Sequence, residues 1–212
     1  MAVRKLKTKH DFSKTIDYYN FCHANNDLPI LDIINERFTR SFRVSFSNYL
    51  RVISNIKYSS TKMSFDDWKI ENDKSNCFFI VESKTLNAPL LIKLDRVLSY
   101  GALDILAGGN GEQYQTESVK EMTVIELTIL KNLGLKIIED LNAAWTPIEN
   151  IKLEYIRTEI NSQFIAFFEP ECKVIRISLQ VEFGLNKGTL EILYPYSTLF
   201  PVRDQLFSNL QG

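Results

Sequence analysis

Hydrophobic side chains recur at every fourth position in two long segments of the chain. The first row consists of Ile34, Phe38, Phe42, Phe46 and Leu50. A second row with the same spacing lies 95 positions later and consists of Ile129, Leu133, Ile137, Leu141 and Trp145. Spacing of this kind gives a helix one apolar stripe. The pattern therefore predicts two long helices, each with one face in the core.

Both predicted helices have residues that suit a helix start. Asp27 and Pro29 fit the first turn of the first helix, because proline has no N–H to leave unpaired there. Thr123 and Glu126 have the spacing of a capping box at the start of the second.

Each long helix is followed by three strand-like runs and a shorter helix. In the first half the runs are roughly 56–65, 77–83 and 89–94, and the closing helix is 96–107. In the second half they are roughly 151–160, 174–183 and 188–194, and the closing helix is 197–210. Pro201 is tolerated only in the first turn of that last helix, which predicts an N-cap near Ser197 or Thr198.

The two halves share more than their order of elements. Ile53–Lys57 recurs 95 positions later as Ile148–Lys152, and Asp104 recurs 100 positions later as Asp204. We therefore predict an α/β (α+β) fold in which a helix–three strands–helix unit occurs twice around a pseudo-two-fold axis. Six strands would form one mostly antiparallel sheet flanked by helices, since each half alone would leave an apolar sheet face bare. The expected domain is 25–212, with repeats at about 27–107 and 122–210.

Composition and charge exclude several classes of protein. The chain has 212 residues, 45% of them hydrophobic, and a formal net charge of -1, which gives no general attraction to nucleic acid. No apolar run approaches the roughly 18 residues of a membrane-spanning helix. Residues 1–24 are predicted to be a mobile basic arm, which is either solvated or docks on an acidic partner. Its basic side chains are Arg4, Lys5, Lys7, Lys9 and Lys14.

Few residues are available for cofactor, metal or histidine chemistry. Cys22, Cys77 and Cys172 lack metal-ligand spacing and read as reduced thiols of a cytosolic protein. His10 and His23 both precede the first predicted helix. We therefore expect no cofactor and no metal. Gly108–Gly111, which holds three of the eight glycines, predicts either a plain helix cap and turn or an exposed loop whose bare backbone can lie against a partner.

Several short segments resemble one family of bacterial motility proteins. They are Leu28–Phe38 in the first helix, Gly108–Gly111 between the halves, Ala143–Trp145, Asn161–Phe164, and Pro195–Ser197 followed by Arg203 and Asp204. In this order, over roughly residues 25–210, they resemble the family that contains CheC, CheX, FliY and the middle domain of FliM. FliM is the member that they resemble most, although Ser162 stands where it has proline.

The resemblance implies a function and a set of site residues. Gly108, Gly109, Asn110 and Gly111 would bind FliG, and Glu36, Arg37 and Arg40 would lie where copies pack side by side in a ring. CheC-type relatives are phosphatases whose helix carries an acid and an amide three residues apart, which Asp32 and Asn35 resemble as a vestigial pair.

The interpretation favoured by the resemblance is a non-enzymatic subunit of the flagellar motor switch that responds to phosphorylated CheY. The alternative is a phosphatase of phosphorylated CheY. The expected location is the cytoplasmic side of the inner membrane at the flagellar basal body. FliN would be joined only through a further C-terminal domain, and no CheY-capturing peptide is visible at Met1–Lys5.

Overall fold

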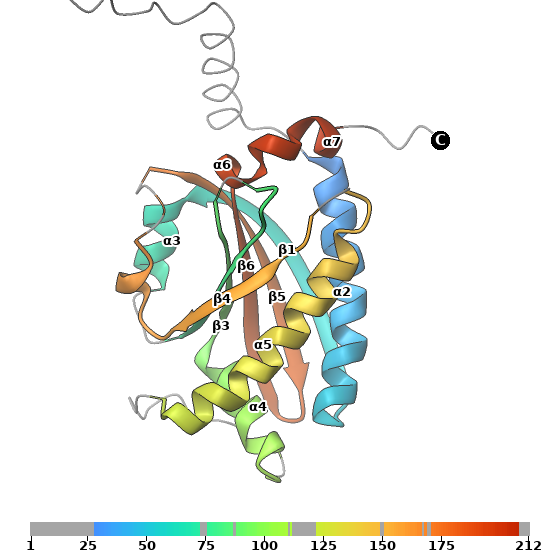
Figure 1. Ribbon diagram of the computed structural model, residues 1–212. Helices are drawn as coiled ribbons and strands as arrows, with labels where there is room; N and C mark the ends of the chain where they lie inside the picture. The colour runs from blue at the N-terminus through green and yellow to red at the C-terminus, as the bar shows by residue number, and fades with distance from the viewer. Residues whose placement is uncertain are drawn as a thin grey trace, which may run out of the picture.

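The computed structural model has long helices packed on a single sheet (Figure 1). It describes residues 28–72, 76–86, 88–109, 111, 122–148, 151–166, 168 and 171–207, so the expected basic arm 1–24 lies outside the described residues. The first half consists of α2 (Pro29–Leu50), β1 (Ser54–Ser64), α3 (Phe65–Glu71), β2 (Cys77–Glu82), β3 (Leu90–Leu94) and α4 (Arg96–Leu106). The second consists of α5 (Val124–Ala144), β4 (Glu154–Glu159), the 3₁₀ turn η1 (Ser162–Phe164), β5 (Lys173–Phe183), β6 (Asn186–Pro195), α6 (Tyr196–Leu199), η2 (Phe200–Val202) and α7 (Arg203–Phe207).

The sheet joins the two halves by exchanging their edge strands. Its six strands lie in the order β1-β5-β6-β3-β2-β4, and every neighbouring pair is antiparallel. The first strand of each half pairs with the second strand of the other half, β1 with β5 and β4 with β2. The predicted fold class is therefore confirmed. Neither half can complete its own part of the sheet.

A local two-fold axis relates the halves and passes between the central strands β3 and β6. Ile92 and Ile192 are direct register partners, and they are also equivalent positions of the two units. The same relation holds where the long helices meet. The Ser45 hydroxyl donates to the carboxylate of Asp140, its equivalent in α5, and Ser41 Oγ donates to Oδ1 of the same carboxylate at 2.5 Å.

The two long helices cover one face of the sheet and enclose the main core (Figure 1). Every position of the first apolar row is buried, and in the second row only Ile129 is partly exposed. The Phe38 and Phe42 rings stack with centroids 5.6 Å apart, and Phe46 meets Phe183 of β5 edge-on at 5.4 Å. Aromatic contacts of this geometry fix α2 on the sheet as well as bury area.

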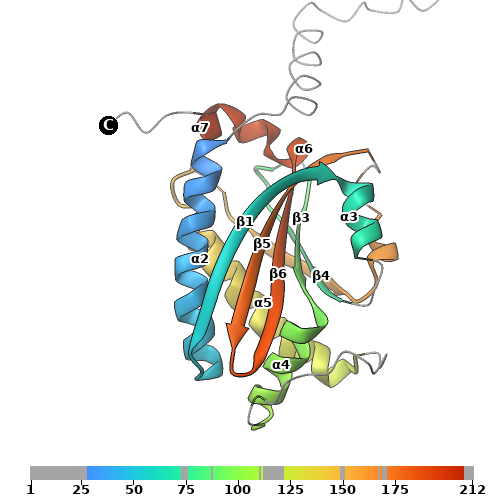
Figure 2. The same ribbon diagram turned by 180° about the vertical axis from the view of Figure 1, so that it is seen from behind.

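The opposite face carries a smaller core with a closed polar network under α3, the helix seen on that side in Figure 2. Lys93 and Glu191 are register partners on β3 and β6, and Lys93 Nζ lies 3.2 Å from Glu191 Oε2. Trp68 Nε1 donates to the same oxygen at 2.8 Å, and Lys93 also donates to Asn72 Oδ1. The ion-paired side chains are only 7% and 8% exposed, so both charges depend on these partners.

The predicted helix starts agree with the structure. Pro29 is in the first turn of α2, whereas Asp27 lies outside the described residues. At the start of α5, Thr123 Oγ1 accepts from Glu126 N at 3.3 Å, and Glu126 Oε2 accepts from Thr123 N at 2.6 Å. Both halves of the predicted capping box are therefore formed.

The closing helix of the second half differs from the prediction. Its helix begins at Tyr196 after the N-cap Pro195, so the expected cap near Ser197 or Thr198 is wrong. Pro201 lies in η2, which separates α6 from α7, instead of in the first turn of one continuous helix. The reason is physical: proline has no N–H to donate and its ring crowds the preceding turn. Periodicity also does not predict α3, because seven residues are too few to show a stripe.

Candidate functional site

Helix α4 carries the glycine-rich loop and is fixed to the sheet at its start. Asp95 is its N-cap: Oδ1 accepts from Leu98 N and Oδ2 from Thr189 N, both at 2.7 Å. Burial raises the pKa of this carboxyl, although the two amide hydrogen bonds oppose the rise. The first turn of α4 also lies so close to β6 that a Cβ on Gly188 would come within 2.5 Å of Leu98 N. The direction in which α4 leaves the sheet is thus set by β6.

The loop begins as a tight reversal at the end of α4. Gly108 N donates to Ile105 O at 3.0 Å, and Gly109 N donates to Asp104 O at 2.8 Å. Gly108 has φ +89° and Gly111 has φ +70°, a conformation that side chains disfavour. Gly108 and Gly109 are exposed and Gly111 is buried, while Asn110 lies outside the described residues. The predicted cap and the predicted exposed backbone therefore coexist in one loop.

The Asp104 carboxylate braces this loop. Its Oδ2 accepts from Gly111 N at 3.1 Å. It also fills the space beside Gly109, where an added Cβ would overlap the carboxyl group. On the far side, Asn186 Nδ2 of β6 donates to Gly111 O at 3.4 Å. The backbone of the loop is thus held in one shape by a side chain from α4 and another from the sheet.

Replacing Asp104 with alanine is expected to release the loop without unfolding the domain. The change removes the acceptor for Gly111 N, and because Asp104 is exposed the cost should be about 1 kcal/mol or less. Asp104→Asn keeps an acceptor oxygen and is the matched control. Amide exchange at Gly109 and Gly111 should accelerate in the alanine variant only. Equal protection in the two variants would show that the carboxylate does not hold the loop.

Glu36, Arg37 and Arg40 lie together on the exposed side of α2. Arg40 Nη2 is 3.0 Å from Glu36 Oε2 in an exposed pair one turn apart, which contributes a few tenths of a kcal/mol, about 0.3–0.5. Tyr58 of β1 lies beside this side of the helix. Burial raises its pKa, and the charges of Glu36 and Asp32 raise it further. The surface is a polar one that is accessible from outside.

Asp32 and Asn35 do not form a shared surface site. Asp32 is exposed, but the Asn35 side chain is fully buried, and its Oδ1 accepts from Tyr194 Oη at 3.3 Å. Trp145 is buried beside Tyr194, with ring centroids 5.9 Å apart. The local two-fold places leucines at the three equivalent positions, since Asn35, Trp145 and Tyr194 correspond to Leu130, Leu50 and Leu94. One end of the core is thus polar where the other is entirely apolar.

The comparisons with known proteins agree with this architecture. The family model for the flagellar motor switch protein FliM matches residues 24–210. The chain belongs to the FliM family. FliM of Pseudomonas aeruginosa is 28% identical over 186 residues, which cover 87% of this chain and 57% of that protein. FliM of Escherichia coli is 27% identical over 181 residues, covering 84% of this chain and 54% of that protein. The chain spans little more than half the length of these curated FliM relatives.

Solved FliM structures share the fold. The FliM middle domain of Vibro alginolyticus superimposes with a TM-score of 0.73 at 25% identity, covering 83% of this chain and 99% of that one. FliM in a FliG–FliM complex from H. pylori superimposes with a TM-score of 0.74 at 16% identity, covering 93% of this chain and 99% of that one. The FliY of Thermotoga maritima also matches, with a TM-score of 0.69 at 18% identity, 87% of this chain and 98% of that one.

The clustered glycines predicted a loop at Gly108–Gly111, but not the side chains that hold it. Asp104 was visible only as one of the repeated positions, paired with Asp204. Asn186 gave the signal of a turn residue beside Gly184 and Gly188. Their convergence on Gly111 depends on the return of β6 beside α4, which no local pattern encodes.

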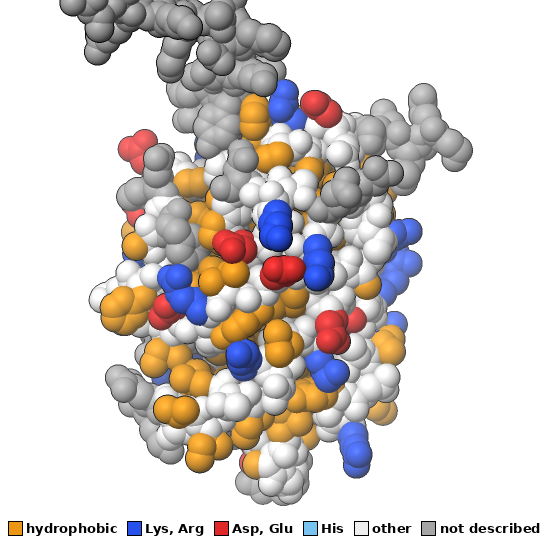
Figure 3. Space-filling model, viewed as in Figure 1, with side chains coloured by type: hydrophobic (Ala, Val, Ile, Leu, Met, Phe, Trp, Pro, Cys, Tyr) orange, Lys and Arg blue, Asp and Glu red, His pale blue; other side chains and the backbone are white. Residues whose placement is uncertain are grey.

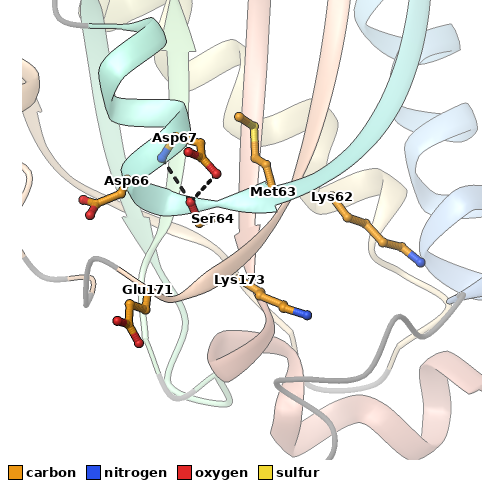
Figure 4. A pocket seen from close by; sticks show the side chains of 7 residues that line it. All are labelled: Lys62, Met63, Ser64, Asp66, Asp67, Glu171 and Lys173. Carbon is orange, nitrogen blue, oxygen red and sulfur yellow. Dashed lines mark hydrogen bonds between the residues drawn. The ribbon is translucent and has the colours of Figure 1, made fainter.

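Elsewhere on this FliM-family domain, an open hollow of about 450 Å³ lies where β1 meets α3. Figure 4 shows that its charged side chains do not converge: Lys62 and Lys173 extend to one side, and Asp66 and Glu171 to the other. Asp67 instead accepts from Ser64 Oγ at 2.6 Å as part of the α3 cap. The side chains that line this hollow therefore form no candidate catalytic centre.

The part of the chain that the structure describes holds neither a cluster of metal ligands nor a membrane-spanning helix. Among the described residues, no three His, Cys, Asp or Glu side chains are grouped so that they could hold a metal ion. Within the same part of the chain, no helix combines the length and hydrophobicity needed to cross a bilayer. On the face seen in Figure 3, basic and acidic side chains are interspersed with hydrophobic ones. That face offers no expanse of a single charge.

Proposed function

We propose that this domain is a non-enzymatic subunit of the flagellar motor switch that holds FliG through Gly108, Gly109, Asn110 and Gly111. The braced loop carries the proposal, together with membership of the FliM family. Glycine backbone that is held in place, as at Gly109 and Gly111, loses little entropy on binding, and it can approach another protein closely. The related H. pylori protein was solved in a FliG–FliM complex, which supports FliG as the partner.

The same proposal includes the role of the domain in the rotor. Copies would pack side by side in a ring, with Glu36, Arg37 and Arg40 of α2 at the contact. Phosphorylated CheY would change these contacts and so the direction of rotation, at the cytoplasmic face of the inner membrane. FliN would join through a further domain of the full FliM protein. Family membership supports these roles, and the exposure of the α2 side chains is compatible with them.

The burial of Asn35 argues against the phosphatase alternative. An amide that orients an attacking water must reach the phosphoryl group of its substrate. Here the Asn35 side chain is in the core against Tyr194, while Asp32 is on the surface. The Asn35 side chain would have to leave the core before it could act together with Asp32. We therefore propose a holding and switching role for this domain instead of CheY dephosphorylation.

Gly109→Val is expected to weaken binding of the FliG middle region by about tenfold or more, which corresponds to about 1.4 kcal/mol. The added side chain cannot share the space of the Asp104 carboxylate, so that carboxylate must move away and release Gly111 N. Lys84→Val is the control, because Lys84 is an exposed turn residue in the link between β2 and β3, outside the loop. Calorimetric titration measures both, and thermal unfolding shows that both variants fold.

Two results would contradict the proposal in different ways. Failure of the unmodified chain to bind FliG would remove the proposed partner. Unchanged affinity in a folded Gly109→Val variant would leave the partner but show that the loop is not the contact.

A further inference from the structure

Two exposed aliphatic side chains lie at the same end of the molecule as the glycine loop. Leu185 is in the turn between β5 and β6 and is 73% exposed, and Ile53 is in the link between α2 and β1 and is 93% exposed. The two links are neighbours, because Ser54 and Phe183 are register partners at the ends of β1 and β5. Figure 1 shows this end of the sheet beside the last turn of α4.

The turn that carries Leu185 is in direct contact with the loop. A Cβ on Gly184 would lie 3.4 Å from Gly111 O, and Asn186 donates to that same oxygen at 3.4 Å. Asn186 therefore contacts Gly111, and Gly184 lies close to it. The turn is itself anchored, since Phe183 is buried against Phe46. A protein that rests on the backbone of the loop would therefore meet the Leu185 side chain in a fixed position.

The fold alone does not account for a leucine at this position. Phe183 and Asn186 are register partners, so Gly184 and Leu185 form a two-residue turn. Gly184 supplies the positive φ that such a turn needs, +54°, so the second position tolerates many side chains and does not require a leucine. Leu185 makes little contact with the core, and so contributes little to stability there. Its apolar surface is left for another molecule.

We propose that Leu185, with Ile53 beside it, is the apolar part of the FliG-docking surface. This inference rests on the proposed function, because the glycine loop supplies backbone polar groups but almost no apolar area. Interfaces draw most of their affinity from a few residues that become fully buried near their centre. Burial of one leucine side chain corresponds to about ten- to a hundredfold in affinity. The loop would fix the position of FliG, and Leu185 would supply much of the affinity.

Leu185→Asp is expected to weaken binding of the FliG middle region to the intact chain by about tenfold or more, and Ile53→Asp by less. Leu185→Met should keep affinity within about twofold, since it preserves apolar volume. Ile70→Asp is the matched control, because Ile70 is 76% exposed on α3, on the other side of the molecule. Calorimetric titration measures affinity, and thermal unfolding verifies each variant.

Each other result overturns the inference in a recognisable way. If Gly109→Val loses affinity while Leu185→Asp binds as well as the unmodified chain, the proposed function stands and Leu185 is not an anchor. If the unmodified chain does not bind FliG, both proposals fail. Equal losses in Leu185→Asp and Ile70→Asp would reflect added charge alone. A change in self-association with unchanged FliG affinity would assign the surface to a second copy of this chain.

Discussion

Replacing Lys93 with methionine is expected to lower the free energy of unfolding by about 3–5 kcal/mol. Among the described residues, the substitution leaves Trp68 Nε1, at 2.8 Å, as the one donor to the carboxylate of Glu191 buried under α3. It also removes the donor that Asn72 Oδ1 accepts from. A buried charge without its counter-ion costs far more than the pair contributes when it is intact. Urea unfolding, followed by far-UV circular dichroism, measures the loss.

The double variant Lys93→Met, Glu191→Gln is the control for this prediction. Glutamine keeps an oxygen that can accept from Trp68 Nε1 but carries no charge. The double variant should therefore be more stable than Lys93→Met alone, within about 1–2 kcal/mol of the unmodified chain. If Lys93→Met alone costs less than about 1 kcal/mol, the pair is not the buried, mutually dependent one that its geometry indicates.

Residues 28–109 and residues 122–207, prepared as separate fragments, are each expected not to fold. The first fragment keeps the β2–β3 pair but lacks β5 as the partner of β1 and β4 as the partner of β2. The second keeps the β5–β6 pair but leaves β4 with no partner strand. In each, the long helix would cover an incomplete sheet. Far-UV circular dichroism should show no cooperative thermal transition for either fragment.

Mixing the two fragments is expected to restore the transition, because the contacts between halves are non-covalent. The midpoint should rise with fragment concentration, as it does when folding requires association. A cooperative transition in one fragment alone would contradict the exchange of edge strands. Failure of the mixture at high concentration would show that the segment joining the halves is needed for folding as well as for linkage.

Most elements of the fold could be predicted because each has a local signature. The Phe38–Phe42–Phe46 stripe predicts a helix by itself, and Thr123 with Glu126 predicts the start of α5. The duplication was visible as well, since Ile53–Lys57 and Asp104 have equivalents in the second half. The pairing of β1 with β5 was not, because strand order depends on contacts between residues more than 100 positions apart. Pro201 was recognised as a helix breaker from its local sequence, but its position within the closing helix was predicted wrongly.

The candidate site could be predicted only in part, and for a similar reason. Gly108, Gly109 and Gly111 stand out in the sequence because glycines are few and these are clustered. Lys93 and Glu191 look like ordinary strand residues, and only the register of β3 and β6 shows that they are a buried pair. Asn35 was expected to stand with Asp32 as an acid–amide pair, yet its side chain is in the core. Charge and polarity in a sequence do not reveal which side of a helix faces Tyr194.

The axis between Ile92 and Ile192 has a consequence for how copies of this domain can be arranged. A two-fold rotation makes opposite directions perpendicular to its axis equivalent, so a row of such objects at right angles to the axis would have no inherent direction. The joint between the two units occurs only once in the chain, and the braced glycines are at its start. The duplicated domain therefore carries the glycine loop once, at one end. The loop gives each copy an orientation. In a closed ring of copies, all of the loops would face the same way.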